Sequence, residues 1–460
     1  MSGQTRKHKL MSIFTPTKTL FSKMAWAAYN TYRKGLHYRQ RLADMDARLN
    51  EGRESIAQFQ WERLRKLLRH AYQTTPYYQT LLDSLHIQPD DIRQPRDLLQ
   101  IPTLEKSTIR AQLNELLSRA FPKHRLMKNA TGGSSGTPLI FYQNRAYWNQ
   151  RNLSVYYFDR WAGWDFGERQ LIVWGSLPDV DRAMGLKQRM NNFWRNYRWL
   201  NGFELTAKKM IDAFEQMQRW RPQTILAYAS SLHLFAECLS ENQLTPDWKL
   251  KGIISSAEML YPHYRKLAEN VFKTKVYNRY GGREVGLIAM ECKAGRLHIN
   301  CHDLYIEIDS DVPYTQPGEI LITQLNNYAM PFIRYRIGDV GVLSDEVCPC
   351  GNPLPILGDL MGRTTATFRT RSGKLIHGGY FTQQFYEIKT VVQFQLIQES
   401  YDLCRLKLVV NDKFTNETHE WIVRQIKEAL GENVEVRVEF VDQIPPPTSG
   451  KIAFTISKIE

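Results

Sequence analysis

Apolar and polar positions alternate along the chain in the manner of α/β proteins. Between residues 131 and 345, short apolar runs that predict buried strands are separated by segments with the 3.6-residue period of amphipathic helices. The elements expected are strands at 171–175, 224–228, 252–255 and 276–280, with helices at 208–219, 231–239 and 262–272. This alternation predicts a largely parallel sheet covered by helices on both faces.

The regions on either side of this core have other patterns. Residues 52–120 have helical periodicity, and Pro76 is expected to end the first helix. From 303 to 343 the pattern becomes β-rich, and beyond Gly362-Arg363 several strands surround one helix at 418–430. We therefore expect an α/β protein in three parts. They are a basic N-terminal arm or helix (1–50), a large domain of mostly parallel sheets with a β-rich subdomain (51–361), and a small C-terminal α+β domain (362–460).

The composition is that of an ordinary globular protein. The 460 residues are 43% hydrophobic and 23% charged, and no apolar run approaches the ~20 residues of a membrane span. The N-terminus lacks the continuous apolar segment of a secretory signal. Six cysteines in so long a chain do not indicate a disulfide scaffold, so a reducing, cytoplasmic location is expected.

Positive charge is concentrated near the N-terminus. The formal net charge is +14, and nine Lys and Arg residues precede the first acid, Asp44. Phe21, Met24, Ala28 and Tyr32 recur there at helical spacing. One interpretation is an arm that contacts anionic lipid at the inner membrane face, and the other is a helix that packs on the large domain with its lysines in solvent.

A second basic stretch, residues 187–209, is interleaved with aromatic side chains. It suits an acidic substrate or a phosphate-bearing carrier, and simple aromatic packing is the alternative. Because no recognisable nucleic-acid-binding module accompanies the stretch, a nucleic-acid partner is not expected.

A loop rich in glycine and hydroxyl side chains precedes the apolar run 139–142. Glycines let a backbone approach a polyanion, and hydroxyl groups add hydrogen-bond donors, so this loop is a candidate for holding ATP phosphates. The loop lacks the Walker A arrangement, and a surface turn is the alternative. The candidate residues are Thr131, Gly132, Gly133, Ser134, Ser135, Gly136 and Thr137.

Further segments follow this loop in a characteristic order. They are Ser255-Ser256-Ala257-Glu258, Tyr280-Gly281-Gly282-Arg283-Glu284, Arg334-Tyr335-Arg336-Ile337-Gly338-Asp339, Gly362-Arg363 and Gly450-Lys451. With the upstream text Ile101-Pro102-Thr103-Leu104-Glu105-Lys106, this set resembles the adenylate-forming superfamily of acyl-CoA synthetases and adenylation domains. Within it, the chain is most similar to the phenylacetate–CoA ligase branch and its capsular-polysaccharide subgroup. The resemblance covers roughly residues 60–460.

The resemblance implies a role for each motif. The 131–137 loop would hold the β- and γ-phosphates of ATP, Tyr280 would stack on adenine, and Asp339 would accept the ribose hydroxyls. Glu284 would coordinate Mg²⁺ and Arg363 would lie near the ribose and phosphates. Lys451, on a mobile C-terminal domain, would sit between the substrate carboxylate and the α-phosphate. The remaining nucleotide contacts that the resemblance implies are Ala257, Glu258 and Gly281.

The implied reaction needs no protein nucleophile. A small carboxylic acid attacks the α-phosphate of ATP to give an acyl-adenylate, and the acyl group then passes to CoA, a carrier thiol, or an amine or hydroxyl of a sugar. Transfer of AMP itself to a hydroxyl, and a non-catalytic scaffold role, are the alternatives. Three departures from the family pattern bear on them: the phosphate loop lacks a lysine, Arg283 replaces a threonine, and Thr365 stands where relatives have a pivot aspartate.

Cysteine and histidine spacing suggests a structural zinc site. Cys292 and His298 form C-x5-H, and Cys348 and Cys350 follow in a Cys-Pro-Cys-Gly sequence. Thiolate and imidazole ligands in a tetrahedral set suit Zn²⁺. Cys301 and His302 are competing ligand candidates, and buried thiols with a core histidine are the alternative.

Overall fold

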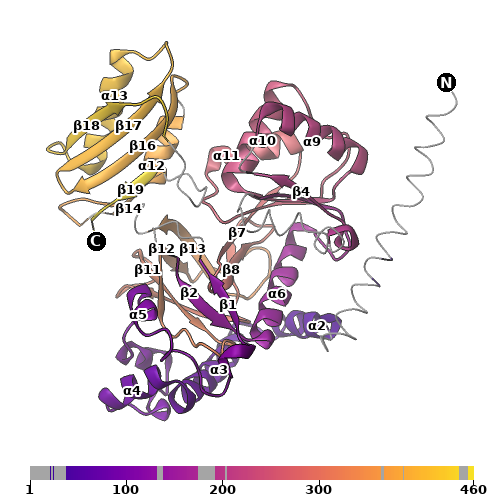
Figure 1. Ribbon diagram of the computed structural model, residues 1–460, viewed down its shortest axis with the longest axis vertical. Coiled ribbons are helices and arrows are strands. Elements are labelled where there is room, and N and C mark those ends of the chain that lie inside the picture. The colour runs from indigo at the N-terminus through magenta and orange to yellow at the C-terminus, as the bar shows by residue number, and fades with distance from the viewer. Residues whose placement is uncertain are drawn as a thin grey trace.

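The chain folds into a large and a small body of secondary structure (Figure 1). The computed structural model describes residues 38–131, 138–174, 192–202, 205–363, 367–373, 375–386, 388–444 and 454–459, together with Phe21 and Met24. Most of the predictions for residues 1–37, and those for residues 132–137, Thr365 and Lys451, concern residues outside the described ranges.

An eleven-stranded mixed sheet forms the centre of the large body. Its parallel half comprises β4 (Tyr197–Asn201), β3 (Gln170–Trp174), β5 (Thr224–Tyr228), β6 (Gly252–Ser256) and β7 (Val276–Gly282), in that spatial order. The antiparallel half continues with β8 (Gly286–Glu291), β9 (Leu297–Ile299), β13 (Ile356–Arg363), β12 (Tyr335–Ser344), β11 (Gly318–Gln324) and β10 (Leu304–Asp309). The β-rich region expected from the sequence therefore continues the same sheet.

Helices cover both faces of the parallel half. Ile253 of β6 packs in one core with α9 (Ala207–Trp220), α10 (Ala229–Glu241) and α11 (Pro262–Phe272). The next residue, Ile254, packs in another core with α6 (Arg145–Asp159). Because successive strand side chains point to opposite faces, the two helix layers lie on opposite sides of the sheet.

The N-terminal helices pack against the antiparallel half. The elements are α2 (Tyr38–Leu49), α3 (Arg53–Thr74), α4 (Pro76–Ser84), short 3₁₀ turns at Pro89–Asp91 and Pro95–Gln100, and α5 (Lys106–Ala111). Pro76 begins α4 directly after α3 has ended, as expected of a residue that cannot continue a helix but suits its first turn. Leu42 and Met45 of α2 are buried in the large core, although the sequence places them in the N-terminal arm.

A β-hairpin and the small body complete the structure. The hairpin consists of β1 (Met127–Ala130) and β2 (Ile140–Gln143). The small body contains β14 (Thr367–Arg369), β15 (Leu375–His377), α12 (Gly379–Tyr386), β16 (Val391–Ser400), β17 (Leu403–Val410), α13 (Asn416–Leu430), β18 (Glu435–Phe440) and β19 (Thr455–Ser457). Its four-stranded sheet has the order β18-β17-β16-β19, and its core begins at Phe368. In Figure 1 this yellow body stands apart from the large sheet.

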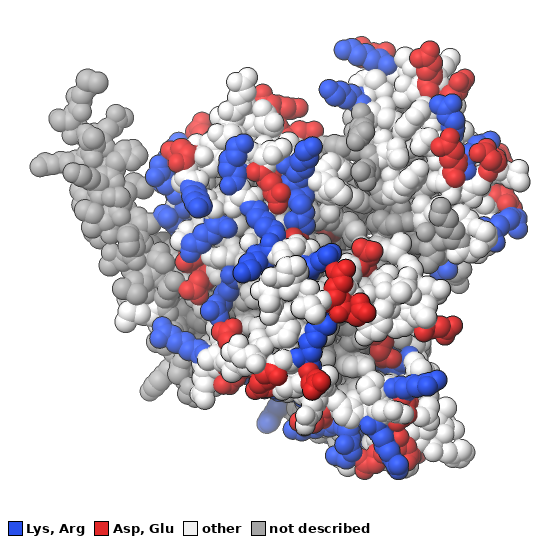
Figure 2. All heavy atoms as spheres, turned by 180° about the vertical axis from the view of Figure 1, so that it is seen from behind, with Lys and Arg blue, Asp and Glu red and all other residues white. Residues whose placement is uncertain are grey.

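Charged side chains of both signs cover the face seen in Figure 2, where a group of Lys and Arg lies on the large body with Asp and Glu around it and both signs are interspersed on the small body. Of residues 1–37, the structure describes only Phe21 and Met24, which are exposed. Within the described ranges, no helix is both long and apolar enough to cross a membrane.

Candidate nucleotide site

Four of the residues predicted for the site come together where the two halves of the large sheet meet. Tyr280 lies near the carboxyl end of β7, and its hydroxyl donates a hydrogen bond of 2.6 Å to Oδ2 of Asp339. The Nε atom of Arg363 lies 3.0 Å from Oδ1 of the same carboxylate. Asp339 and Arg363 are opposite each other in the β12–β13 pair, so the sheet register sets this ion pair.

The Asp339 carboxylate is buried, and its contacts with Tyr280 and Arg363 use different oxygens. An ionised carboxylate offers about four lone-pair directions, so these two contacts do not exhaust its acceptor capacity. The nearby negative charge raises the pKa of Arg363, and burial raises the pKa of Tyr280 well above its usual range. Tyr280 is therefore a neutral donor, and Arg363 is a cation.

Glu284 lies in the turn between β7 and β8 and is only 5% exposed. Its Oε1 atom accepts a hydrogen bond of 3.1 Å from the Tyr335 hydroxyl, whose pKa is raised by burial. The backbone of the turn is held from two sides. Gln324 donates to the Glu284 carbonyl at 2.9 Å, and Arg151 of α6 donates to the Arg283 carbonyl at 2.6 Å. These contacts fix the direction of the carboxylate.

Close packing explains the glycines before this turn. A Cβ atom at Gly281 would lie 2.6 Å from the carbonyl oxygen of Gly286, and one at Gly282 would lie 3.3 Å from Oε2 of Glu284. A side chain at position 282 would therefore crowd the Glu284 carboxylate. A buried carboxylate is the kind of oxygen ligand that Mg²⁺ takes in nucleotide sites.

The phosphate-loop candidate connects β1 to β2. The ends of the loop are joined through Thr131, whose amide donates to the Leu139 carbonyl at 3.0 Å and whose hydroxyl accepts from the Leu139 amide at 2.9 Å. Residues 132–137 are outside the described ranges, so their role in phosphate binding stays a prediction.

Ala257 and Glu258 follow β6 at its carboxyl end. Ala257 has a φ of 69°, a left-handed conformation that is uncommon for residues with a side chain. Oε2 of Glu258 accepts hydrogen bonds from the amide and the hydroxyl of Ser230, at 2.9 and 2.6 Å. Ser230 is in the first turn of α10, so the Glu258 carboxylate caps that helix.

Sequence reasoning missed three side chains that surround the site: Lys106, Arg151 and Tyr335. Lys106 Nζ donates a hydrogen bond of 2.6 Å to the Ile337 carbonyl. Arg363 Nη1 donates to the same oxygen at 3.2 Å. Lys106 and Tyr335 belong to motifs on which the family resemblance rests, but the sequence analysis assigned no role to either residue.

The basic and aromatic stretch at 187–209 is partly described. It contains edge strand β4, and the guanidinium of Arg198 lies 4.7 Å from the ring centroid of Trp220. Arg195 lies 5.9 Å from the Tyr197 ring in the same way. These contacts favour the packing interpretation for the described part of the stretch.

The four predicted zinc ligands form one cluster. The ligand atoms of Cys292, His298, Cys348 and Cys350 all lie within 4.8 Å of one another. His298 Nδ1 donates to the Leu354 carbonyl at 2.9 Å, which leaves Nε2 directed at Cys350 Sγ, 3.4 Å away. Burial lowers the pKa of His298 and so favours its neutral, ligating form. Three thiols and one oriented imidazole fit a tetrahedral Zn²⁺ site.

The competing candidates are not in this cluster. Cys301 is buried, and its pKa is raised by that burial. His302 is also buried, its Nε2 atom has no hydrogen-bond partner among the described residues, and burial lowers its pKa to about 3. Both side chains pack in the interior as core residues.

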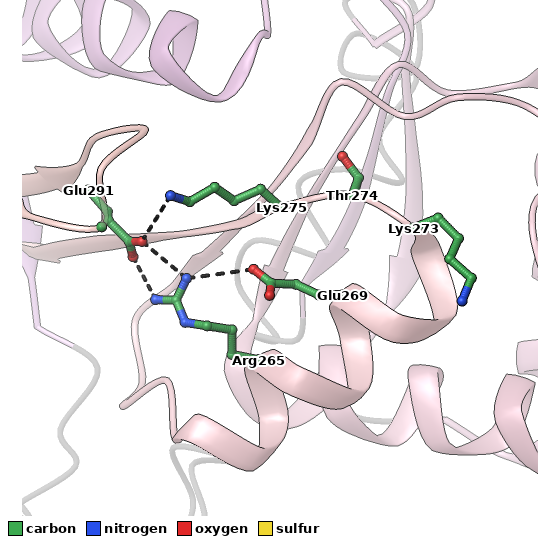
Figure 3. A pocket seen from close by; sticks show the side chains of 7 residues that line it. Arg265, Glu269, Lys273, Thr274, Lys275 and Glu291 are labelled. Atoms are coloured by element: carbon green, nitrogen blue, oxygen red, sulfur yellow. Dashed lines mark hydrogen bonds and ion pairs between the residues drawn. The ribbon is translucent and has the colours of Figure 1, made fainter. Parts of the chain in front are cut away.

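An open hollow of about 700 Å³ lies beside the Cys292 turn (Figure 3). Arg265 of α11 points between Glu269 and Glu291, and its contact with Glu291 is 2.6 Å. Lys275 extends toward Glu291 and also donates to the Cys292 carbonyl at 3.3 Å. Arg265 and Lys275 are thus paired with these glutamates, and Lys275 also holds the cysteine turn. The hollow is therefore a poor candidate for a nucleotide.

Known proteins resemble the chain along most of its length. Residues 368–458 match the family model for the CapK C-terminal domain. Protein CapK of Staphylococcus aureus is 23% identical over 413 residues, which cover 88% of this chain and 90% of that protein. A phenylacetate-coenzyme A ligase of Thermus thermophilus is 24% identical over 445 residues, covering 87% of this chain and 96% of the ligase.

The fold also has solved counterparts. A crystal structure of 2-hydroxyisobutyryl-CoA ligase in the postadenylation state, in complex with 2-HIB-AMP, aligns with a TM-score of 0.65 at 17% identity. The alignment covers 88% of this chain and 89% of that one. The chain is thus a homologue of CapK and of the phenylacetate-coenzyme A ligases, with the two-domain fold of adenylate-forming acyl-CoA ligases.

Proposed function

We propose that this chain is an ATP-dependent ligase that activates a small carboxylic acid as its acyl-adenylate. The homology to phenylacetate-coenzyme A ligases and the fold support an adenylate-forming enzyme. One observation carries the assignment of the site. The buried Asp339 carboxylate is bonded to both Tyr280 and Arg363, and these three residues come from motifs far apart in the sequence.

The reaction has two steps. A carboxylate oxygen of the acid attacks the α-phosphorus of ATP, the bond to the bridging oxygen breaks, and pyrophosphate leaves. An acceptor nucleophile then attacks the acyl carbon, AMP leaves with the bonding electrons, and the acceptor proton goes to solvent. Catalysis of this kind rests on positioning and on stabilising charge.

The chain's own residues divide this work. Asp339 would accept the ribose hydroxyls, with Tyr280 against the base and Arg363 near the ribose and phosphates. Lys451, which is outside the described residues, would neutralise the carboxylate and the α-phosphate during the first step. Glu284 would hold a Mg²⁺ ion, which supplies positive charge to the outer phosphates when bound.

The acceptor belongs to the proposal as well. CoA is the first candidate because the homologous ligases are named for it. The other candidate acceptors are a carrier-protein thiol and an amine or hydroxyl group of a sugar. We place the reaction in the assembly of a surface polysaccharide or a secondary metabolite. Peripheral contact of the basic N-terminal segment with the inner membrane face, in a cytoplasmic setting, is part of the same proposal.

A panel of carboxylic acids tests the first step. Uronic acids, aryl acids, amino acids and short acyl chains are incubated with MgATP and the full-length chain, and pyrophosphate release is measured. An acid-dependent release that Lys451→Ala reduces at least ~100-fold supports the ligase, since Lys451 would stabilise the transition state. Lys458→Ala, which removes an exposed lysine paired with Glu399, is the matched control.

The fate of AMP separates the remaining functions. A ligase releases free AMP once an acceptor is added, whereas an adenylyltransferase leaves AMP on its product. A chain that binds no nucleotide and releases no pyrophosphate with any acid would be a scaffold, and the proposal would then be wrong.

We further propose that Cys292, His298, Cys348 and Cys350 bind one structural Zn²⁺ ion. The ligands join the β8–β9 turn to the loop before β13, so the ion would tie together two segments of the antiparallel half. Elemental analysis should find about one zinc per chain, and Cys348→Ser should lose the metal and lower the melting temperature. Cys404→Ser, at a buried cysteine of the small body, should retain it. Fully folded wild-type protein without metal would contradict this site.

A further inference from the structure

The proposed ATP site lacks an expected cation. A triphosphate carries several negative charges, yet the 131–137 loop contains glycine, serine and threonine but no lysine. Backbone amides and hydroxyls can orient phosphates but cannot neutralise them. A second cation from elsewhere in the fold would therefore complete the site.

Lys106 is held in position to be that cation. It is the first residue of α5, and the chain just before it pairs with the start of β12. The Leu104 amide donates to the Arg334 carbonyl at 3.0 Å, and the Arg336 amide donates to the Leu104 carbonyl at 3.1 Å. This short parallel bridge fixes the Lys106 backbone beside the strand that carries Asp339.

The ammonium group of Lys106 shares its acceptor with another cation. Lys106 Nζ and Arg363 Nη1 donate to the Ile337 carbonyl at 2.6 and 3.2 Å. Burial and the Arg363 charge lower the pKa of Lys106, whereas Glu284 and Asp339, in that order of strength, raise it. Two half-buried cations on one neutral carbonyl are an arrangement that an added polyanion would stabilise.

We propose, on the basis of the proposed function, that Lys106 binds the outer phosphates of ATP and supplies the positive charge that the glycine-rich loop lacks. On nucleotide binding, Nζ exchanges the Ile337 carbonyl for phosphate oxygens. AMP lacks the phosphates concerned, so Lys106 distinguishes ATP from AMP.

Binding measurements on the full-length chain test this role. Calorimetric titration of Lys106→Met with MgATP, with AMP and with pyrophosphate is compared with the wild type. A charge-assisted hydrogen bond contributes enough for a loss of about tenfold or more in affinity for MgATP and pyrophosphate. AMP affinity should stay within about twofold, and Lys106→Arg should recover part of the loss.

The control removes a like charge from the same short helix. Arg110→Gln, at an exposed position of α5, should leave both ATP and AMP binding unchanged. Equal weakening of ATP and AMP by Lys106→Met would mean a purely structural role and would overturn the inference. Unchanged MgATP binding would overturn it as well. Wild-type protein that binds neither nucleotide would instead overturn the proposed function.

Discussion

At the residue scale, Asp339 connects the two halves of the site. Its carboxylate contacts Tyr280 from β7 and Arg363 from β13, strands that belong to the parallel and antiparallel halves of the sheet. Glu284 is a separate acid with its own donor, Tyr335. The site thus keeps two carboxylates apart, one suited to hydroxyl groups and the other to a metal ion.

Asp339→Asn should weaken AMP binding by about tenfold or more, because the amide nitrogen cannot accept a hydrogen bond and the charge that holds Arg363 is lost. Equilibrium dialysis with AMP measures the effect. Asp309→Asn removes a half-exposed carboxylate that pairs with Arg336 and should bind AMP like the wild type. Unchanged affinity in Asp339→Asn would remove this residue from the ribose site.

His302 should make folding stability depend on pH. Its folded pKa is about 3, while an unfolded histidine titrates near pH 6.5, so the unfolded chain takes up a proton that the folded one does not. This contribution is complete above pH 6.5 and is lost as pH falls toward 3, by roughly 3 kcal/mol at pH 4.

Chemical denaturation at several pH values measures this slope. His302→Phe, which removes the titrating group, should flatten the loss of stability between pH 6.5 and 4 relative to the wild type. His419→Phe, on helix α13 of the small body, is the control that should keep it. Parallel slopes for wild type and His302→Phe would contradict the prediction.

At the element scale, the tight turn from β7 to β8 aims Glu284. The turn is held from α6 by Arg151 and from β11 by Gln324. Its strands approach so closely that position 281 has no room for a Cβ atom. The chain therefore needs glycine there for packing, independently of any contact with ligand.

Gly281→Ala should destabilise the fold by about 1–3 kcal/mol, because the new methyl group would force the Gly286 backbone to move. It should also reduce acid-dependent pyrophosphate release, since Glu284 is carried by the same turn. Gly358→Ala on β13, where the nearest atom to the new Cβ is 3.3 Å away, is the milder control. A Gly281→Ala variant as stable and active as the wild type would show that the turn can accommodate a methyl group and would contradict the prediction.

At the scale of the whole molecule, the small body has a hydrophobic core of its own. Phe368, Phe381, Leu406 and Ile422 are among its buried members, and the cores of the large body share no residue with it. A chain of about a hundred residues with a separate core is long enough to fold alone. The division expected at residues 361 and 362 falls within β13, whose last two residues belong to the large sheet, and the core of the small body begins at Phe368.

A fragment of residues 362–460 should fold by itself and unfold cooperatively. Circular dichroism should show native α+β structure with one thermal transition. The same fragment with Ile422→Asp, a charge placed in the core, should remain unfolded. A wild-type fragment with the spectrum of a random coil would contradict independent folding.

Strongly periodic segments were predicted well. The helix expected at 262–272 has those bounds, and the strand expected at 224–228 does too. The sequence did not reveal β4, because aromatic and basic residues obscure the alternation at this edge strand. It also left open whether the β-rich segment forms its own sheet, since strand pairing across long distances leaves no local pattern.

The sequence predicted which residues of the candidate site would lie together but not all of their contacts. Tyr280, Glu284, Asp339 and Arg363 were identified from their motifs, and the fold brings them together. The cap that Glu258 forms on α10 was not foreseen, because Ser230 lies 28 residues earlier in the chain. The contact between Lys106 and the Ile337 carbonyl was not foreseen either, because the two residues are 231 positions apart in the sequence.

Local chemistry and periodicity, which a sequence carries in neighbouring residues, thus determined most of the helices and strands and the types of side chain proposed to bind ATP and zinc. Only the tertiary structure decided which strands are neighbours, which carboxylate meets which donor, and that Lys106 and Arg363 share the Ile337 carbonyl. These contacts depend on sheet register and helix packing between distant segments, and neither is written into any single stretch of the chain.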